Sequence, residues 1–287
     1  SSDVCSSDLA RISSEVYKQT PKNPGSRNPK VANMYKNGAP YGRILEFSPR
    51  INKPFFYKSW YKKRTQIKNN IIEKMQSGLI MVLADIVESR DKCTGDHVRK
   101  TAAYVKLILQ LMKENNLYPE ILTDEYIEDV CNSAPLHDVG KIKVSDVILN
   151  KPGKLTDEEF AEMKNHTLAG KEVIESAMKL TTDPGYLKEA LNLATYHHEK
   201  WNGTGYPMGL AGEDIPLSAR IMAVSDVFDA LVSQRSYKKP FTFEEAMKII
   251  EEGAGTHFDP VIAKLFVENR ERVKEIMEEH KRERNEL

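Results

Sequence analysis

The sequence feature that most constrains this fold is a set of histidines and aspartates spread along one long helical pattern. The set comprises His97, His137, Asp138, His166, His197, His198 and Asp226, and only His257 and His280 among the histidines lie outside it. Neutral imidazole and carboxylate are the groups that hold Fe, Mn or Zn in proteins. Asp226 lies in an apolar stretch, where a carboxylate is costly to bury unless it is paired or metal-bound. The set therefore predicts a metal site with enough donors for two ions.

The sequence between these residues is helical in pattern. Apolar residues recur every three or four positions from 64 to 86, and ranges 98–113, 124–136 and 218–233 continue in the same way. Capping boxes begin at Thr156 and Thr242, the first opening a helix that continues past His166, and Asp259 before Pro260 reads as a helix start. Few segments resemble strands. We predict an all-α helical bundle with a metal centre in its core.

Composition divides the chain into three parts. Residues 1–64 are rich in Pro, Gly and polar residues, and we expect a mostly irregular segment, the remnant of a truncated upstream module. Residues 65–270 are expected to form the catalytic domain with its leading helix. Residues 271–287 are expected to form a charged, solvated helical tail that frays.

Charge and cysteine content exclude several classes of protein. Lys+Arg and Asp+Glu both number 42, and this zero net charge argues against broad binding of DNA or RNA. Three cysteines without a CxxC pair indicate a reducing, cytoplasmic location. The longest apolar run, 78–87, is too short to cross a bilayer. Because the chain starts with Ser, a membrane anchor in a missing upstream part stays open.

Several motifs together carry a family resemblance. They are TGDHVR from Thr94, HDVGKI from His137, KPGKLT from Lys151, MKNH from Met163, HHEKWNGTGYP from His197, the stretch from Ala219 to Leu231, RSYK from Arg235 and GTHFDP from Gly255. In this order they cover about residues 65–270. The chain resembles the HD-GYP branch of the HD phosphohydrolases, and the long HHEKWNGTGYP element makes the resemblance specific.

The resemblance implies a metal-dependent phosphodiesterase that hydrolyses cyclic di-GMP to linear pGpG by a metal-activated hydroxide, with a second cut to GMP left open. It implies two divalent ions, Fe or Mn. His97, His137, Asp138 and Asp226 match the ligands of one ion, Asp138 is the expected bridge, and His166, His197 and His198 match those of the second ion. Some relatives bind a third ion through a Glu at the position of Cys93, so a third ion is doubtful here.

Other residues match the substrate side of the family's site. Lys141 is expected to contact a phosphate and to assist catalysis with Asp138; Tyr206, Arg235 and Lys238 are expected to bind substrate, and Gly205, Tyr206 and Pro207 form the GYP loop. In this family that loop is linked to contacts with GGDEF-domain proteins, and a homodimer is compatible with the resemblance. From its position, Glu199 is expected to accept a hydrogen bond from a ligating imidazole.

Two alternatives stay open. One is an HD phosphohydrolase that acts on a nucleotide or on another cyclic dinucleotide such as cyclic GMP-AMP. The other is a non-catalytic receptor or docking module for cyclic di-GMP, which the complete donor set disfavours. Measurement of metal content together with product identification would separate all three.

Overall fold

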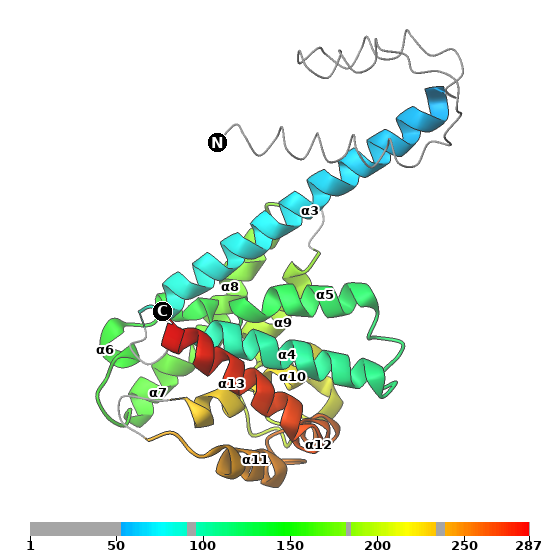
Figure 1. Ribbon diagram of the computed structural model, residues 1–287. Helices are drawn as coiled ribbons and strands as arrows, with labels where there is room; N and C mark the ends of the chain where they lie inside the picture. Colours follow the sequence, from blue (N-terminus) through cyan, green and yellow to red (C-terminus); the bar gives the residue numbers. More distant parts are fainter. Residues whose placement is uncertain (1–52, 91–95, 182–184, 234–238, 287) are drawn as a thin grey trace. The chain divides into compact units, whose positions relative to one another are not determined.

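The computed structural model describes residues 53–90, 96–181, 185–233 and 239–286, and these residues form helices without any strand (Figure 1). The elements are α3 (Lys53–Glu88), α4 (His97–Glu114), α5 (Asp124–Ser133), η2 (Ala134–Leu136), η3 (Val139–Lys143), α6 (Asp146–Leu149), α7 (Asp157–Lys164), α8 (His166–Met178), α9 (Leu187–Tyr196), η4 (Gly212–Asp214), α10 (Leu217–Val232), α11 (Phe243–Glu252), α12 (Pro260–Glu268) and α13 (Arg270–Glu286). Those labelled η are 3-10 helices. The predicted all-α fold is confirmed.

The chain divides into two units, residues 1–68 and 69–287, and α3 continues from the first into the second. Most of the segment expected to be irregular lies outside the described residues. Its last part, 53–64, is helical, so the leading helix begins at Lys53, eleven positions before Arg64. Pro54 lies in the first helical turn, where its missing N–H is tolerated, and no other proline follows until Pro119. The predicted domain boundaries at residues 270 and 271 stay a prediction.

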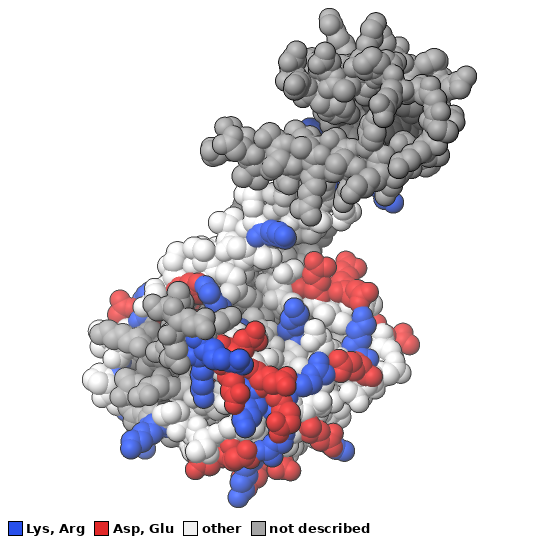
Figure 2. Space-filling view, in the orientation of Figure 1, with Lys and Arg blue, Asp and Glu red and all other residues white. Residues whose placement is uncertain are grey.

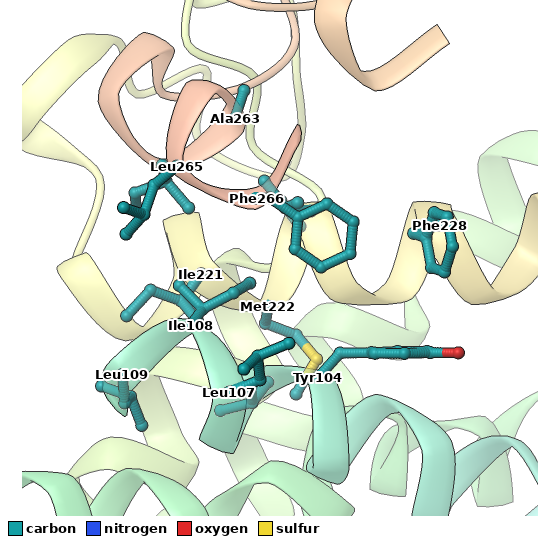
Figure 3. Packing of buried hydrophobic residues seen from close by; sticks show 14 of the residues in the cluster. Tyr104, Leu107, Ile108, Leu109, Ile221, Met222, Phe228, Ala263, Leu265 and Phe266 are labelled. Carbon is teal, nitrogen blue, oxygen red and sulfur yellow. The ribbon is translucent and has the colours of Figure 1, made fainter. Parts of the chain in front are cut away.

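The core of the second unit lies where α4 packs against α10 and α12. Figure 3 shows Tyr104 and Ile108 from α4 facing Met222 and Phe228 from α10, with Phe266 of α12 beside Phe228. The rings of Tyr104 and Phe228 meet edge to face, with centroids 5.2 Å apart. This packing holds α4 and α10 side by side, which matters because each helix carries a predicted metal ligand.

The C-terminal helix is more than a solvated tail. Val273 is fully buried, Met277 is nearly so, and α13 packs against α4. These two residues are four positions apart, so they form a narrow apolar stripe on an otherwise charged helix. The stripe explains why α13 contributes to the core despite its polar composition.

Both predicted capping boxes are present, at Thr156 with Glu159 and at Thr242 with Glu245. The helix that follows Thr156 is shorter than expected, because it ends at Lys164 and a new helix begins at His166. The His166 imidazole and the Thr167 hydroxyl donate to carbonyl oxygens in the last turn of α7. These side chains replace the backbone donors that would have continued α7.

Surface charges and helix hydropathy add two observations. On the face of the second unit drawn in Figure 2, Lys and Arg are interspersed with Asp and Glu over the described residues. No helix in those residues combines the length and apolarity that a bilayer crossing needs.

Candidate metal centre

Six of the seven predicted donors lie at or directly beside the ends of helices. His97 and His166 are the first residues of α4 and α8, and His197 follows the last residue of α9. His137 and Asp138 lie between η2 and η3, and Asp226 alone comes from the middle of a helix, α10. Side chains at helix ends can turn inward without breaking a helical hydrogen-bond ladder.

The donors form two groups in which all ligand atoms lie within 4.8 Å of one another. The first group is His97, His137 and Asp226, and the second is Asp138, His166, His197 and His198. In the first group, Nε2 of His97 lies 3.3 Å from Oδ1 of Asp226. The predicted donors therefore converge, and they divide almost as the resemblance implies.

Asp138 faces both groups with different oxygens. Its Oδ2 lies 3.5 Å from Nε2 of His137 in the first group. Its Oδ1 lies 3.4 Å from Nε2 of His166 and 3.7 Å from Nε2 of His197 in the second group. A carboxylate placed in this way can give one oxygen to each of two neighbouring cations.

The hydrogen bonds of the histidines indicate which nitrogen is available to a cation. Nδ1 of His137, His166 and His197 lies 2.9, 2.8 and 2.7 Å from a backbone carbonyl oxygen, respectively. A carbonyl only accepts, so each Nδ1 carries the proton and each neutral ring presents Nε2 as a lone pair. We infer these tautomers from the acceptors.

These lone pairs then have no protein donor to satisfy them. Nε2 of His166 and Nε2 of His197 lie 3.5 Å apart, and both are acceptors in these tautomers. Nε2 of His137 and Oδ1 of Asp138 are buried without any hydrogen-bond partner. Buried acceptors that face each other are unfavourable unless a positive charge lies between them. The donor set thus fits divalent cations.

Electrostatics favour the ligating form of several residues. Burial, reinforced by the neighbouring imidazoles, lowers the pKa of both His197 and His198, so the rings are neutral at pH 7. Burial acts to raise the pKa of Asp138, but Lys141 and the surrounding histidines outweigh it and keep this pKa well below its usual value. Asp138 is therefore an anion at neutral pH.

His97 has the opposite behaviour. Burial acts to lower its pKa, but the hydrogen bond to Asp229 and the charges of Asp226 and Asp229 raise it to about 9. The carboxylates around this imidazole thus attract positive charge. A metal cation at Nε2 would compete with a proton for the same position.

Asp229 orients His97 from behind. Its Oδ2 accepts from Nδ1 of His97 at 2.7 Å, and its Oδ1 accepts from the Ser233 hydroxyl at 3.0 Å. A carboxylate that holds the far nitrogen of a ligating imidazole fixes its tautomer and raises its basicity. The i, i+3 spacing from Asp226 was the available signal.

Replacing Asp229 with asparagine is expected to weaken Mn²⁺ binding by about 10- to 100-fold, because His97 loses its charged partner. Titration of the purified chain with Mn²⁺ measures this. Asp259→Asn is the matched control, since Asp259 is also buried but pairs with Arg220 at 2.7 Å and caps α12. The control should lower stability and leave Mn²⁺ affinity intact. Equal affinity of Asp229→Asn and the wild type would exclude this role.

Lys141 lies at the centre rather than in solvent. Its Nζ is 2.6 Å from Oδ2 of Asp138, and its side chain is 21% exposed. The ammonium therefore has access both to the donor set and to whatever approaches it. The predicted phosphate contact itself stays a prediction.

Glu199 has a different partner from the one expected. Its Oε1 accepts from the backbone N–H groups of Met208 and Gly209, at 2.7 and 3.1 Å, and its Oε2 from that of Leu210 at 3.1 Å. The expectation that it binds a ligating imidazole is wrong in this structure. Three backbone donors satisfy this buried carboxylate, which holds the chain directly after the GYP loop.

The GYP loop covers the second donor group. The Tyr206 ring lies 4.8 Å from the His198 ring, and Lys164 lies 5.9 Å above the Tyr206 ring. Gly205 is required sterically, because a Cβ there would lie 2.3 Å from the backbone nitrogen of Lys200. Tyr206 therefore lies beside the second donor group, and its predicted contact with substrate stays a prediction.

Three of the predicted residues cannot be placed. Cys93, Arg235 and Lys238 lie outside the described residues. Their roles stay predictions.

The fold and donor set define a helical protein with imidazole and carboxylate groups that can hold divalent metal ions. The chain belongs to the HD domain family, whose model matches residues 81–262. The resemblance to the HD-GYP branch is confirmed by the relatives that follow.

The chain is similar to several bacterial proteins. It is 46% identical over 198 residues to a "Cyclic di-GMP phosphodiesterase" of Vibrio cholerae, covering 69% of this chain and 40% of that protein. It is 40% identical over 165 residues to a "Cyclic di-GMP phosphodiesterase" of Thermotoga maritima, covering 58% and 43%. It is 39% identical over 191 residues to the "3'3'-cGAMP-specific phosphodiesterase 2" of Vibrio cholerae, covering 67% and 34%. The chain thus spans less than half the length of these relatives.

Proposed function

We propose that this chain is a metal-dependent phosphodiesterase that hydrolyses cyclic di-GMP. The observation that carries the proposal is the pair of donor groups with Asp138 between them, its two oxygens facing opposite sets of histidines. The printed activity of relatives at 46% and 40% identity supports the choice of substrate. Two divalent ions, Fe or Mn, are the proposed cofactors, since both suit imidazole and carboxylate ligands.

Bound at the two groups, such ions would lower the pKa of a coordinated water and offset phosphate charge. The protein's own residues do the rest. Asp138 holds the two groups in fixed relation, and the backbone carbonyls behind His137, His166 and His197 keep each Nε2 directed inward. Tyr206 lies beside the second donor group. Burial raises the pKa of the Tyr206 phenol and keeps it protonated at neutral pH. The proposed product is linear pGpG, with further hydrolysis to GMP as a second stage.

The remaining contacts complete this proposal. Lys141 is proposed to pair with a phosphate oxygen of the substrate, because positive charge at Asp138 would weaken its present ion pair and leave the ammonium available. Arg235 and Lys238 are proposed to contact guanine or phosphate, as the resemblance implies. The GYP loop is proposed as the contact for GGDEF-domain proteins, and a homodimer as the assembly.

Lys141→Ala is expected to keep its metal content and lose about a hundredfold in kcat, because one cationic group leaves the reacting phosphate. Elemental analysis and steady-state kinetics measure the two quantities. Lys143→Ala is the control: Lys143 lies in the same 3-10 helix, but pairs at 2.6 Å with Glu172, and both side chains are more than half exposed. Kinetics equal to those of the control would remove Lys141 from the mechanism.

The proposal is tested with anaerobically prepared protein loaded with Fe²⁺ or Mn²⁺. The chain is incubated with cyclic di-GMP, and the products are separated by chromatography while bound metal is counted by elemental analysis. Formation of pGpG by metal-loaded but not by metal-free protein supports the proposal. Cyclic di-GMP that binds and is never cleaved by any metal form would show a receptor instead.

A second candidate is hydrolysis of 3'3'-cGAMP, which the printed name of a relative at 39% identity favours. The two substrates share the phosphodiester ring and differ in one base. Parallel kcat/KM measurements on both cyclic dinucleotides decide between them, because the ratio of the two values gives the specificity of the chain.

A further inference from the structure

Arg90 joins the end of α3 to the segment that follows Asp138. Its Nε and Nη2 donate to Oδ1 of Asp146 at 3.2 and 2.8 Å. Its Nη1 donates to the backbone carbonyls of Lys141 and Ile142 at 3.1 and 2.7 Å, and Nη2 donates also to that of Val144 at 3.0 Å. All five N–H donors of the guanidinium therefore point at residues 141–146.

The backbone of Arg90 adds a further link to the same region. The side-chain amide of Asn150 donates to the Arg90 carbonyl at 2.8 Å. Three of the oxygens that Arg90 binds are backbone carbonyls at or directly after the C-terminal end of η3, and that of Lys141 accepts also from the N–H of Val144 at 3.0 Å. A cation at this end is also favoured by the helix dipole. Only a planar guanidinium can serve so many diverging acceptors at once.

The segment that Arg90 binds carries the centre's shared carboxylate and its cation. Asp138 is the residue directly before η3, and Lys141 lies within η3. Movement of η3 would shift the 2.6 Å ion pair between Lys141 and Asp138, and with it the direction in which the two Asp138 oxygens point. Fixing the carbonyl of Lys141 restricts this movement.

The end of α3 also contacts the start of α4, which supplies His97 to the centre. Oε2 of Glu88 accepts from the backbone N–H of Val98 at 3.2 Å, one residue after His97. Glu88, His97, Asp138 and Lys141 also line one common pocket. The last residues of α3 and Arg90 after them thus contact the two segments that supply His97 and Asp138.

We propose that Arg90 is a positioning residue of the metal centre, which fixes η3 so that Asp138 and Lys141 keep their orientation. This inference rests on the proposed function for its kinetic readout, but its metal-binding readout does not need substrate. Arg90 itself touches neither the donors nor the reacting atoms. Its effect is exerted through the carbonyl of Lys141.

The test compares Arg90→Ala, Arg90→Lys and Arg99→Ala in the full chain. Arg99 is the matched control, because its guanidinium also pairs with an aspartate, Asp85, but this 3.4 Å pair lies away from η3 and its side chains are 61% and 45% exposed. Three quantities are measured: the Mn²⁺ dissociation constant without substrate, kcat and KM for cyclic di-GMP, and hydrogen exchange of the amides from 141 to 150. Arg90→Ala is assayed again with added guanidinium chloride at low millimolar concentration.

Arg90→Ala is expected to weaken Mn²⁺ binding and lower kcat by about 10- to 100-fold each, with KM nearly unchanged and exchange faster over residues 141–150. Guanidinium should restore part of both losses, and Arg90→Lys should fall between wild type and Arg90→Ala. Arg99→Ala should stay within about twofold of wild type.

Wild-type Mn²⁺ affinity and kcat in Arg90→Lys would overturn the inference, because a lysine cannot reproduce the five-donor fork. The same holds for Arg90→Ala if it folds and binds Mn²⁺ like wild type. If Arg90→Ala does not fold, Arg90→Lys decides alone. If wild type cleaves no cyclic dinucleotide, the proposed function fails, whereas the Mn²⁺ affinities still decide the role of Arg90.

Discussion

Asp138→Ala is expected to lose bound metal and, with it, more than about a thousandfold in turnover of cyclic di-GMP. Removal of one electrostatic group from an active site costs about 10²- to 10³-fold, and Asp138 exceeds this because it serves both donor groups. Metal per chain is measured by elemental analysis, and turnover by product chromatography. Asp138→Asn, which keeps the size and removes the charge, should show nearly the same loss.

The same substitution should leave the metal-free protein folded. In the absence of metal, removal of Asp138 breaks its ion pair with Lys141 but also removes Oδ1, a buried acceptor without a hydrogen bond, so the two effects on stability partly offset each other. We expect a similar Tm for metal-free wild type and variant, and a rise in Tm on adding Mn²⁺ only for wild type. Asp214→Ala, an exposed aspartate in η4, is the control and should keep both metal and turnover. Full metal content in Asp138→Ala would contradict the site.

The donor set was predictable from the sequence because ligand chemistry is carried by residue type and order. His97, His137 and Asp226 are far apart in the chain, yet each lies at a break in a helical pattern or within an apolar face. Apolar faces must be buried together, so polar residues on them have only each other as partners. Their convergence into two groups follows from that requirement.

The hydrogen-bonding partners of the metal-donor residues were not predictable from the sequence in the same way. Asp229 could have capped its own helix, and it reaches His97 only because α10 packs beside α4. Glu199 was expected to bind an imidazole, but the loop that returns past it offers three backbone donors. Such choices depend on which element lies nearby after folding, which residue spacing alone does not determine.

Helix boundaries show a related limit. The break between α7 and α8 arises from side-chain bonds of His166 and Thr167 to the preceding turn, and no proline or glycine marks it. The start of α3 at Lys53 was missed because the polar composition of residues 1–64 outweighed the absence of helix breakers after Pro54. Local propensity is a weak guide where side chains compete with the backbone.

Gly140→Ala is expected to lower the free energy of unfolding by about 3 kcal/mol or more, an unusually large effect for one methyl group. A Cβ at Gly140 would lie 1.9 Å from the carbonyl oxygen of His166 and 2.3 Å from the nitrogen of Gly170. Both obstacles are backbone atoms, so no rotamer change relieves the clash, and η3 must move away from α8. The loss corresponds to roughly 10 °C in Tm for a domain of this size, which thermal unfolding of the metal-free protein measures.

The same clash connects stability to the metal centre. Gly140 lies two residues after Asp138, and the atom it meets belongs to His166, so separation of η3 and α8 must lengthen the 3.4 Å approach between these two donors. Metal affinity should therefore fall together with Tm. Gly78→Ala is the control, since a Cβ there meets nothing within 4 Å on α3, and alanine should stabilise that helix by about 0.5–1 kcal/mol. An unchanged Tm in Gly140→Ala would mean that η3 and α8 are not in contact, and Asp138 could not then face His166.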